Sequence, residues 1–304
     1  MQERELTGRL RSFFCRQPGL VVPIGDDAAV VRPTGGDVAL CCDPVISGVH
    51  FEASAPLRHV GRTAVNRNLS DLAAMGAKPR WLLCSVVLPR SMSSADLWEL
   101  LRGVRGASAA ASAAVIGGDV AVSDGPLSVH ISAFGFAPKQ PLRRNLLQVG
   151  DTLHVTGSVG GAIDGHHLRF RPALREGAWL AEQDAVRAAM DVSDGLAIDL
   201  ETMLQASGGL GALLDAPAIP IRAAARRLAG GDRAAALRRA LHDGEDYCLL
   251  FGVRRGGRLD HGGPLTARAR RPIGRVVAEP GITLRAGGRM LRVAVDGYQH
   301  EVGR

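Results

Sequence analysis

The sequence is poor in lysine, in aromatic residues and in long apolar runs. Lys78 and Lys139 are the two lysines among 37 basic residues, and aromatic residues make up 4% of the chain. Neither lysine ends a Gly-Lys-Ser/Thr loop or stands in a Val-Ala-Ile-Lys context, which excludes the phosphate-binding loop of P-loop NTPases and the catalytic lysine of protein kinases. If the chain uses ATP, it binds ATP on a different scaffold.

Further absences narrow the class of protein. No apolar run reaches the roughly 18 residues of a membrane span, and the charged start of the chain lacks the apolar core of a secretory signal, so we expect a cytoplasmic protein that does not bind membranes. The five cysteines show neither a Cys-x-x-Cys pair nor zinc-ligand spacing, which indicates reduced, buried thiols. The net charge of +7 comes from arginines without interleaved aromatic residues, so we expect no binding to nucleic acid.

The chain is long enough for two domains, with 304 residues. The segment from Pro138 to Gly150 carries two prolines and three basic residues, and it predicts a boundary between residues 1–138 and residues 139–304. Strands and helices alternate on both sides of it, which indicates an α/β or α+β fold. We expect strands over residues 27–32, 38–42, 81–88, 127–136, 152–156 and 247–253, and helices over residues 2–15, 57–75, 94–113, 173–190 and 195–205.

The most informative feature is the placement of aspartates beside glycine or serine, at predicted junctions between strands and helices. These motifs are Gly25-Asp26-Asp27, Asp43 ahead of Gly48-Val49-His50-Phe51, Asn68-Leu69-Ser70-Asp71, Gly117-Gly118-Asp119, Asp191-Val192-Ser193-Asp194-Gly195 and Gly244-Glu245-Asp246-Tyr247. Carboxylates suit Mg²⁺, which takes oxygen ligands and is usually shared with substrate phosphates. Since no single EF-hand-like loop occurs, the acids have to come together from several segments. The pattern predicts a Mg²⁺–nucleotide enzyme whose site is loose without the metal.

Each motif alone also has an ordinary structural explanation. Asp71 and Asp194 suit helix caps, and residues 117–119 suit a loop after a strand. The joint placement at junctions favours an active site, because sites in α/β folds gather there. The two Ser-Asp pairs, at residues 70–71 and 193–194, further predict a turn at a helix terminus in each half, where backbone N–H groups face phosphates.

Together these motifs resemble those of the thiamine-monophosphate kinase family, in the wider superfamily of aminoimidazole-ribonucleotide synthetase. The resemblance runs in order from residue 24 to residue 300, and its most specific parts are the run from Asn68 to Pro79 and the motifs at residues 193–195 and 245–247. It implies a two-domain fold like that of aminoimidazole-ribonucleotide synthetase, with mixed sheets flanked by helices, and a homodimer. Residues 1–138 would bind ATP and Mg²⁺ and make the dimer contacts, and residues 139–304 would complete the active site.

The resemblance implies ATP-dependent phosphorylation of thiamine monophosphate to thiamine diphosphate, by direct in-line transfer assisted by several Mg²⁺ ions. The attacking phosphate oxygen is already anionic near neutral pH, so no catalytic base is expected, and positioning and charge shielding carry the catalysis. By the same resemblance, the Mg²⁺ ligands are Asp27, Cys41, Cys42, Asp43, Asp71, Asp119, Asp191 and Asp194; the ATP contacts are Gly118, Asp119, Arg144 and Ser193; and the contacts to thiamine monophosphate are His50, Glu245 and Tyr298.

Two features depart from the family pattern. Cys41 and Cys42 stand where the family usually carries Ser-Thr, and because thiols suit softer metals than Mg²⁺, we expect backbone carbonyls to make these contacts. The segment between Gly161 and His167 is shorter than the usual stretch of the family. Two other interpretations stay open: another enzyme of the superfamily, such as selenophosphate synthetase or a hydrogenase-maturation protein, and a nucleotide-binding module without activity.

Overall fold

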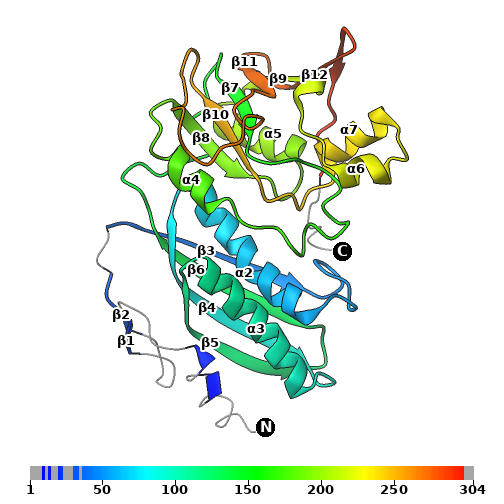
Figure 1. Cartoon of the computed structure of the whole chain (residues 1–304). Helices are drawn as coiled ribbons and strands as arrows, with labels where there is room; N and C mark the ends of the chain where they lie inside the picture. Colours follow the sequence, from blue (N-terminus) through cyan, green and yellow to red (C-terminus); the bar gives the residue numbers. More distant parts are fainter. Residues whose placement is uncertain (1–8, 11–12, 15–19, 23–29, 34–35, 298–304) are drawn as a thin grey trace. The chain divides into compact units, whose positions relative to one another are not determined.

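The computed structural model describes residues 9–10, 13–14, 20–22, 30–33 and 36–297, and the chain divides into two compact units (Figure 1). The first unit holds Met1–Leu72 and Ala77–Lys139, and the second holds Ala73–Gly76 and Gln140–Arg304. Each unit has its own sheet and helices, so the predicted mixed α/β class is confirmed. Of the expected helix over residues 2–15, residues 9–10 and 13–14 are described, and residues 9, 10 and 13 are helical. The other residues of that helix and the start of the expected strand over residues 27–32 lie outside the described residues.

The first unit is built on a four-stranded sheet in the order β3-β6-β4-β5, with β4 and β5 parallel and the other pairs antiparallel. Its elements are β1 (Leu20–Val22), β2 (Val30–Val31), β3 (Val38–Ile46), α2 (Leu57–Ala74), β4 (Lys78–Pro89), α3 (Ser94–Ala110), β5 (Ala114–Ser123) and β6 (Ser128–Phe136). Figure 1 shows α2 and α3 side by side on one face of this sheet. The helices approach closely at two glycines, because a Cβ at Gly61 would lie 2.1 Å from the carbonyl oxygen of Leu100 and a Cβ at Gly103 would lie 2.1 Å from that of Arg58.

The second unit is built on a seven-stranded sheet in the order β13-β12-β9-β11-β7-β10-β8. Only the pairing of β12 with β9 is parallel among the described strands of this sheet. The elements are β7 (Thr152–Val155), α4 (Leu174–Leu180), β8 (Val186–Asp191), α5 (Leu196–Ala206), β9 (Gly211–Asp215), the 3₁₀ turn η1 (Ala216–Ala218), α6 (Ala223–Leu228), α7 (Arg233–His242), β10 (Leu249–Val253), β11 (Gly274–Val277), β12 (Gly281–Ala286) and β13 (Arg289–Arg292).

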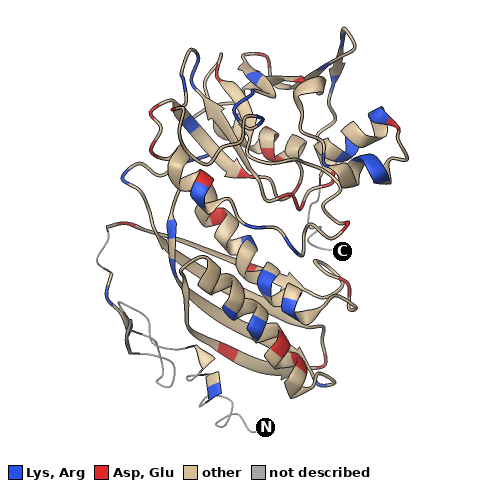
Figure 2. Ribbon diagram, in the orientation of Figure 1, with Lys and Arg blue, Asp and Glu red and all other residues tan. Residues whose placement is uncertain are grey.

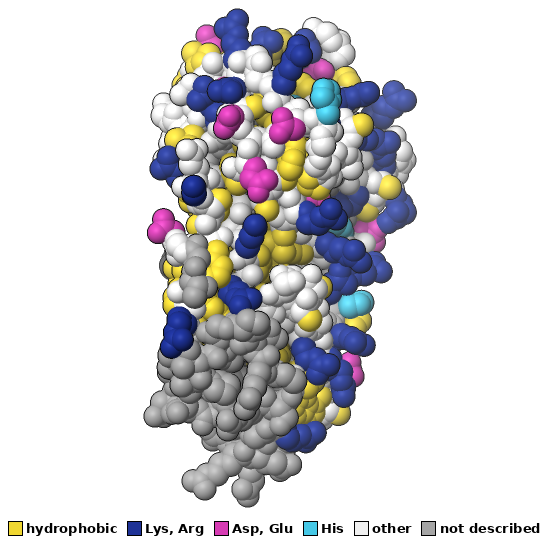
Figure 3. Space-filling view, turned by 60° about the vertical axis from the view of Figure 1, so that its left-hand side comes forward, with side chains coloured by type: hydrophobic (Ala, Val, Ile, Leu, Met, Phe, Trp, Pro, Cys, Tyr) yellow, Lys and Arg dark blue, Asp and Glu magenta, His cyan; other side chains and the backbone are white. Residues whose placement is uncertain are grey.

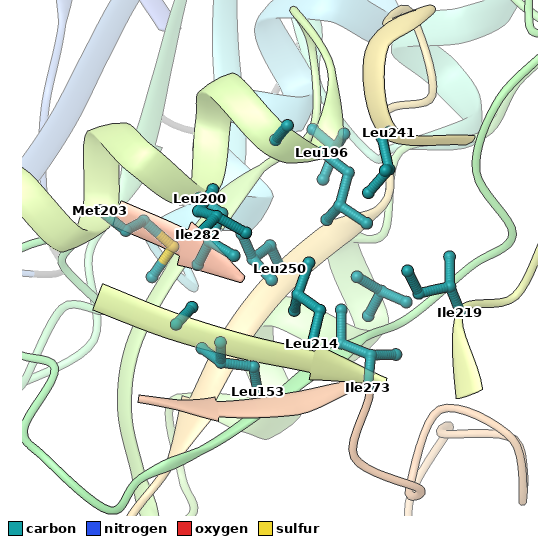
Figure 4. Close-up of a cluster of buried hydrophobic side chains, with 14 of the residues drawn as sticks. Leu153, Leu196, Leu200, Met203, Leu214, Ile219, Leu241, Leu250, Ile273 and Ile282 are labelled. Carbon is teal, nitrogen blue, oxygen red and sulfur yellow. The ribbon is translucent and has the colours of Figure 1, made fainter. Parts of the chain in front are cut away.

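The core of the second unit holds α5 against its sheet. Figure 4 shows Leu200 and Met203 of α5 directed toward the strands, where Leu153 and Leu250 lie, and all four side chains are fully buried. Burying a side chain of this size contributes about 1.5–3 kcal/mol relative to leaving it exposed. The packing therefore fixes the position of α5, whose first residue, Leu196, follows one of the predicted site motifs.

The expected helix over residues 173–190 is wrong. The segment forms the short helix α4, a turn, and then strand β8, which pairs with β10 from Val186 to Asp191. Ala188, Ala189 and Met190 are all buried in this strand. Alanine and methionine favour helices as isolated residues, but pairing and burial in a sheet override that preference.

Two other expected boundaries shift in the first unit. Strand β3 does not end before Asp43 but continues to Ile46, because its whole length pairs with β6. Pro44 is tolerated within it, since β3 is an edge strand and proline is confined to edges and bulges. Helix α3 starts at Ser94 as expected, after the capping box in which the Ser93 hydroxyl accepts from the backbone N–H of Asp96, but it ends at Ala110 and not at residue 113.

Across the residues with described placement, none of the helices has both the length and the apolar character needed to cross a membrane.

Candidate functional site

The predicted site motifs of the first unit meet where α2 passes strand β3. Asn68 of α2 is fully buried, and its Oδ1 accepts the backbone N–H of Asp43 at 2.9 Å. Its Nδ2 donates to the carbonyl oxygens of Asp43 at 3.2 Å and of Ala64 at 3.0 Å. The middle of β3 and the last turns of α2 are therefore locked together, which brings Asp43 and Asp71 to one region of the unit.

The Cys41 side chain lies between these two acids. Burial raises the pKa of the Cys41 thiol well above its usual range, and the negative charges of Asp71 and Asp43 raise it further. The thiol remains protonated and donates to the carbonyl oxygen of Asn68 at 3.2 Å. Cys42 is exposed, and its sulfur accepts from the Ser132 hydroxyl at 3.3 Å. A protonated thiol is a poor ligand for Mg²⁺, so the Cys41 side chain acts here as a hydrogen-bond donor.

The predicted Ser-Asp turn of the first half is wrong. Ser70 and Asp71 lie inside α2, which continues to Ala74, so Asp71 stands in its last turn. The groups left without helical partners at this end are carbonyl oxygens, not N–H groups. The main chain at Asp71 therefore does not face phosphates with N–H donors, and any role of Asp71 rests on its carboxylate.

Gly117-Gly118-Asp119 is not a loop after a strand but the middle of β5. Gly118 lies opposite Cys84 and Asp119 opposite Ser85 of β4, beyond a register shift at Leu82 and Leu83. Gly118 has a φ of +151°, and a Cβ there would lie 1.8 Å from the carbonyl oxygen of Cys84. Only glycine fits at this position, and it allows β5 to continue past the irregularity and to present the exposed side chain of Asp119.

His50 is oriented by a tight turn after β3. The ring Nδ1 of His50 accepts the backbone N–H of Ile46 at 3.0 Å. The backbone N–H of His50 donates to the carbonyl oxygen of Ile46 at 2.9 Å. An accepting Nδ1 places the proton of the neutral ring on Nε2. The second ring nitrogen, Nε2, is then a donor, which suits an anionic or carbonyl-bearing ligand.

In the second unit, three loops share one end of the sheet. Leu249 of β10 pairs with Asp191 at the end of β8, and Leu250 pairs with Val155 at the end of β7. The segments 156–161, 191–195 and 244–247 therefore adjoin the same edge. The backbone N–H of Glu245 donates to the carbonyl oxygen of Ser193 at 2.6 Å, which joins two of these loops directly.

Asp199 is a site residue that the sequence analysis missed. It is buried in the first turn of α5, and its Oδ2 accepts the backbone N–H groups of Asp194 and Gly195, each at 3.1 Å. Burial first, and then the charges of Asp194 and Asp191, raise the pKa of Asp199 to about 8, while the two N–H groups oppose the rise. From the sequence, Asp194, which precedes α5, is expected to suit a cap of this helix. Instead, Asp199 within the helix binds the backbone N–H groups at its start.

Asp199 also shows what the three acids do to one another. Asp191 at the end of β8 and Asp194 before α5 both act on its carboxyl group, so the three lie within electrostatic range. Carboxylates gathered in this way repel one another and attract cations. The spacing of five residues between Asp194 and Asp199 is the one sequence signal that points to the third acid.

The remaining predicted residues are placed as follows. The Asp27 and Tyr298 positions lie outside the described residues, although a Cβ on the preceding Gly297 would lie 2.9 Å from the carbonyl oxygen of Asp194. The carbonyl oxygen of Arg144 accepts from Ser207 just beyond the C-terminus of α5. Ser193 precedes the N-terminus of that helix. At 1.5 Å per residue, the length of α5 separates its two ends by about 15 Å. The structure therefore does not bring the main chains of Arg144 and Ser193 together.

The donor set fits Mg²⁺ in kind. Among the residues with described side chains, no group of three or more His, Cys, Asp or Glu is gathered closely enough to hold a metal ion. Carboxylates nevertheless lie near one another in each unit, Asp43 with Asp71 and Asp191 with Asp194. Since Mg²⁺ usually takes one or two carboxylates and completes its octahedron with water and substrate phosphates, such pairs suit a metal that arrives with its nucleotide.

Arginines are spread over both units. Figure 2 shows basic residues on α2 and α3 as well as on α6 and α7, and the face in Figure 3 carries both basic and acidic side chains. Two ion pairs neutralise part of the charge near α6 and α7, Arg227 with Asp164 and Arg239 with Asp243 at 3.2 Å. Exposed pairs of this kind contribute at most about 1 kcal/mol each.

Comparison with known proteins first gives the class. Residues 25–137 match the family model described as AIR synthase related protein, N-terminal domain. This match includes the parallel β4–β5 pair with Gly118 beyond its register shift, and it includes the acids of β3 and α2. The first unit is therefore the N-terminal domain of an AIR synthase-related protein.

Longer matches define the family. A thiamine-monophosphate kinase from Rhodopirellula baltica is 37% identical over 98% of this chain and 97% of that relative. The crystal structure of thiamine-monophosphate kinase from Stenotrophomonas maltophilia K279a has a TM-score of 0.79 and 32% identity, and the match covers 93% of this chain and 96% of that one. The chain belongs to the thiamine-monophosphate kinase family, which confirms the resemblance seen in the sequence. The structure of AaThiL complexed with AMPPCP and TMP, 24% identical, shares the fold with a TM-score of 0.76 over 99% of both chains.

Proposed function

We propose that this protein phosphorylates thiamine monophosphate to thiamine diphosphate with ATP, by direct in-line transfer. The observation that carries the proposal is the family match over nearly the whole length of the chain, to a relative named for this reaction. The fold relative AaThiL is known in complex with AMPPCP and TMP, which supports the pairing of these two substrates. The acidic motifs by which the chain resembles the family are all present in order, which argues against a module that has lost its activity.

The chemistry needs charge control more than acid–base groups. The attacking phosphate oxygen is anionic near neutral pH, so no residue has to remove a proton from it, and positioning with electrostatic stabilisation accounts for most of the catalysis of phosphoryl transfer. Several Mg²⁺ ions, when bound, would neutralise the two approaching phosphate groups. Their carboxylate ligands would be Asp27, Asp43, Asp71 and Asp119 from the first domain, and Asp191 and Asp194 from the second.

The backbone of β3 would supply an oxygen ligand as well. Asn68 binds both polar backbone groups of Asp43 and so fixes this part of β3. Backbone carbonyls are oxygen ligands of the kind that Mg²⁺ prefers, whereas thiols suit softer metals. We therefore assign the metal contacts at Cys41 and Cys42 to their backbone carbonyls, with both thiols as bystanders.

The other residues have binding roles in this proposal. Gly118 allows the nucleotide to approach β5 closely, and Ser193 and the exposed Arg144 contact ATP, the latter as a phosphate clamp. His50 donates from Nε2 to thiamine monophosphate. Glu245 balances the positive charge of the thiazolium, and Tyr298 offers it an aromatic face. Residues 1–138 act as the nucleotide- and metal-binding domain of a homodimer in the cytoplasm, and residues 139–304 complete the site.

A coupled assay of ADP release tests the reaction class. With ATP and Mg²⁺, we expect turnover with thiamine monophosphate and little with thiamine, which lacks the attacking phosphate, or with aminoimidazole precursors. Asp71→Asn removes one negative charge without changing the shape of the side chain, and we expect it to retain less than about a tenth of the wild-type kcat, a loss of more than about 1.4 kcal/mol. A variant that keeps more than this removes Asp71 from the metal-binding set.

A further inference from the structure

A buried ion pair stands directly beside the proposed substrate residue Glu245. The guanidinium Nη2 of Arg222 lies 2.7 Å from Oδ1 of Asp246, and the two side chains are only 15% and 1% exposed. Neither residue belongs to the predicted set of metal or substrate contacts. Burial raises the pKa of Asp246 to about 6, while the N–H of Gly160 and the charge of Arg222 oppose the rise, so the carboxylate is ionised at neutral pH.

The pair ties together the loops at one end of the sheet. Both carboxylate oxygens of Asp246 accept the backbone N–H of Gly160, at 3.0 and 2.8 Å. Arg222 donates from Nε to the carbonyl oxygen of Gly160 at 3.2 Å and from Nη2 to that of Ser158 at 2.6 Å. Asp243, three residues before Asp246, accepts the N–H of Gly161 at 2.9 Å. In the glycine turn after β7, the backbone N–H groups are thus bound by the carboxylates of Asp246 and Asp243, and the carbonyl oxygens are bound by the guanidinium group of Arg222.

The residues on either side of Asp246 have unfavourable backbone conformations. Within the described part of the chain, three residues other than glycine have a positive φ: Ser112, Glu245 at +57° and Tyr247 at +49°. The left-handed conformation costs roughly 1–2 kcal/mol for a residue with a side chain, and such strain persists only where the surroundings enforce it. Glu245 and Tyr247 flank the buried carboxylate of Asp246, which indicates that Asp246 holds both residues in this strained conformation.

Other contacts complete the clamp around this segment. The ring of Tyr247 stacks on that of Phe170 with centroids 4.1 Å apart, and Nε2 of His166 lies 3.1 Å from the carbonyl oxygen of Asp246. The N–H groups of Glu245 and Tyr247 donate to the carbonyl oxygens of Ser193 and Val192 at 2.6 and 2.8 Å. Glu245 therefore sits between an anchored residue and the loop that carries Ser193 and Asp194.

A stability role alone does not account for this arrangement. Desolvation of two buried charges offsets most of their attraction, so such a pair adds little net stability while it imposes a defined geometry. Here the geometry imposed is the direction in which Glu245 leaves the main chain. A strained residue held by charged anchors is typical of a binding position that must be preorganised.

We propose that Asp246 and Arg222 are positioning residues that hold Glu245 in its left-handed conformation and so set the affinity for thiamine monophosphate. The inference rests on the proposed function, in which Glu245 contacts this substrate. Asp246 and Arg222 themselves touch neither substrate; they act through the main chain of residues 244–247 and through the turn at residues 158–161.

A double-mutant cycle tests the proposal in the full-length chain. Asp246→Asn places an amide N–H₂ against the guanidinium of Arg222 and should raise the KM for thiamine monophosphate about tenfold, with kcat changed less than about threefold. Glu245→Gln alone should also raise this KM. Because Asp246 acts through Glu245, the double variant should bind the substrate no more weakly than Glu245→Gln, so the two effects should not add.

A second ion pair, with a buried carboxylate and a partly exposed arginine, provides the matched control. Asp151 and Arg187 pair at 3.3 Å, with the carboxylate side chain 2% exposed. They lie at the start of β7 and β8, whereas Asp246 adjoins the ends of those strands. Asp151→Asn should lower the melting temperature as Asp246→Asn does, leave the KM for thiamine monophosphate within about twofold of wild type, and combine additively with Glu245→Gln.

Arg222→Lys covers the case in which Asp246→Asn fails to fold. Lysine keeps the charge but loses the fork to Ser158 and Gly160, and it should raise the same KM without changing kcat. Folded variants at positions 246 and 222 with a wild-type KM, or an additive cycle, would overturn the inference. A wild-type KM in Glu245→Gln would also overturn the inference, but the proposed reaction would still stand. If the wild-type chain fails to phosphorylate thiamine monophosphate, the proposed function and this inference are both overturned.

Discussion

The side-chain amide of Asn68 binds both polar backbone groups of Asp43. The N–H of Asp43 donates to Oδ1 at 2.9 Å, and Nδ2 donates to the Asp43 carbonyl at 3.2 Å. The amide therefore fixes the middle of β3 to the last turns of α2. This contact explains why an asparagine, and not an aspartate, stands three residues before Asp71 in a region otherwise rich in acids.

We expect Asn68→Asp to destabilise the first unit strongly. The carboxylate cannot donate to the carbonyl oxygens of Asp43 and Ala64. A buried polar group that loses its hydrogen bond lowers the free energy of unfolding by about 1–3 kcal/mol, and a charged group lowers it by more. Urea unfolding should show this loss in the free energy of unfolding. Asn145→Asp, at an exposed position, should change the stability by less than about 0.5 kcal/mol. Equal stability of Asn68→Asp and wild type would contradict the role assigned to the amide.

Replacing Cys41 with Ser and Cys42 with Thr should change the Mg²⁺ requirement little. The backbone carbonyls of residues 41 and 42 are present in either form, and a serine hydroxyl can replace the Cys41 thiol as donor to the carbonyl of Asn68. The measurement is the Mg²⁺ concentration that gives half of the maximal activity. A drop of about tenfold or more, worth roughly 1.4 kcal/mol, would show that hydroxyl groups are ligands and that the native chain has a weakened metal site.

Glu245→Gly should be more stable than Glu245→Ala, and both should weaken substrate binding. Glycine adopts the φ of +57° found at this position at no steric cost, whereas alanine keeps the strain. We expect Glu245→Gly to be about 1 kcal/mol more stable than Glu245→Ala in thermal or urea unfolding. Both variants should show the raised KM for thiamine monophosphate. If Glu245→Gly is the less stable of the two, the strain assigned to this residue is absent.

His154 should make the stability depend on pH between about 4 and 6.5. The ring is buried against Phe251, with centroids 5.1 Å apart, and burial lowers its pKa from 6.5 to about 4. As the pH falls below 6.5, the unfolded chain takes up the proton first, so the stability contributed by the neutral ring is complete above pH 6.5 and is lost toward pH 4. His154→Gln should flatten this part of the profile by about 2–3 kcal/mol relative to wild type. Parallel profiles would refute the assignment.

The sequence predicts some features of the site because their signals are local. The acidic motifs and the end of α2 before Gly76 follow from spacing and glycine, and the mixed α/β class follows from alternation. The position of Gly118 inside β5 does not follow, because a bulge opposite Leu82 and Leu83 depends on a strand that lies elsewhere in the sequence.

Features set by long-range contacts stay hidden in the sequence. Strand β8 is rich in helix-forming residues, and only its pairing with β10 makes it a strand. Asp199 has the pattern of an ordinary residue on an amphipathic helix until its contacts with residues 194 and 195 are seen. Arg222 and Asp246 are 24 residues apart, and nothing in their local contexts indicates that they pair.

The most direct test of the central claim is to follow the transferred phosphoryl group itself. The purified protein is incubated with Mg²⁺, thiamine monophosphate and ATP carrying ¹⁸O on its γ-phosphoryl group, and the products are resolved by ³¹P NMR and mass spectrometry. The account predicts that ADP and thiamine diphosphate form in equal amounts, that the label lies entirely in the terminal phosphoryl group of thiamine diphosphate, and that thiamine gives no product. ADP formed without labelled thiamine diphosphate, or formed equally with thiamine, would contradict it.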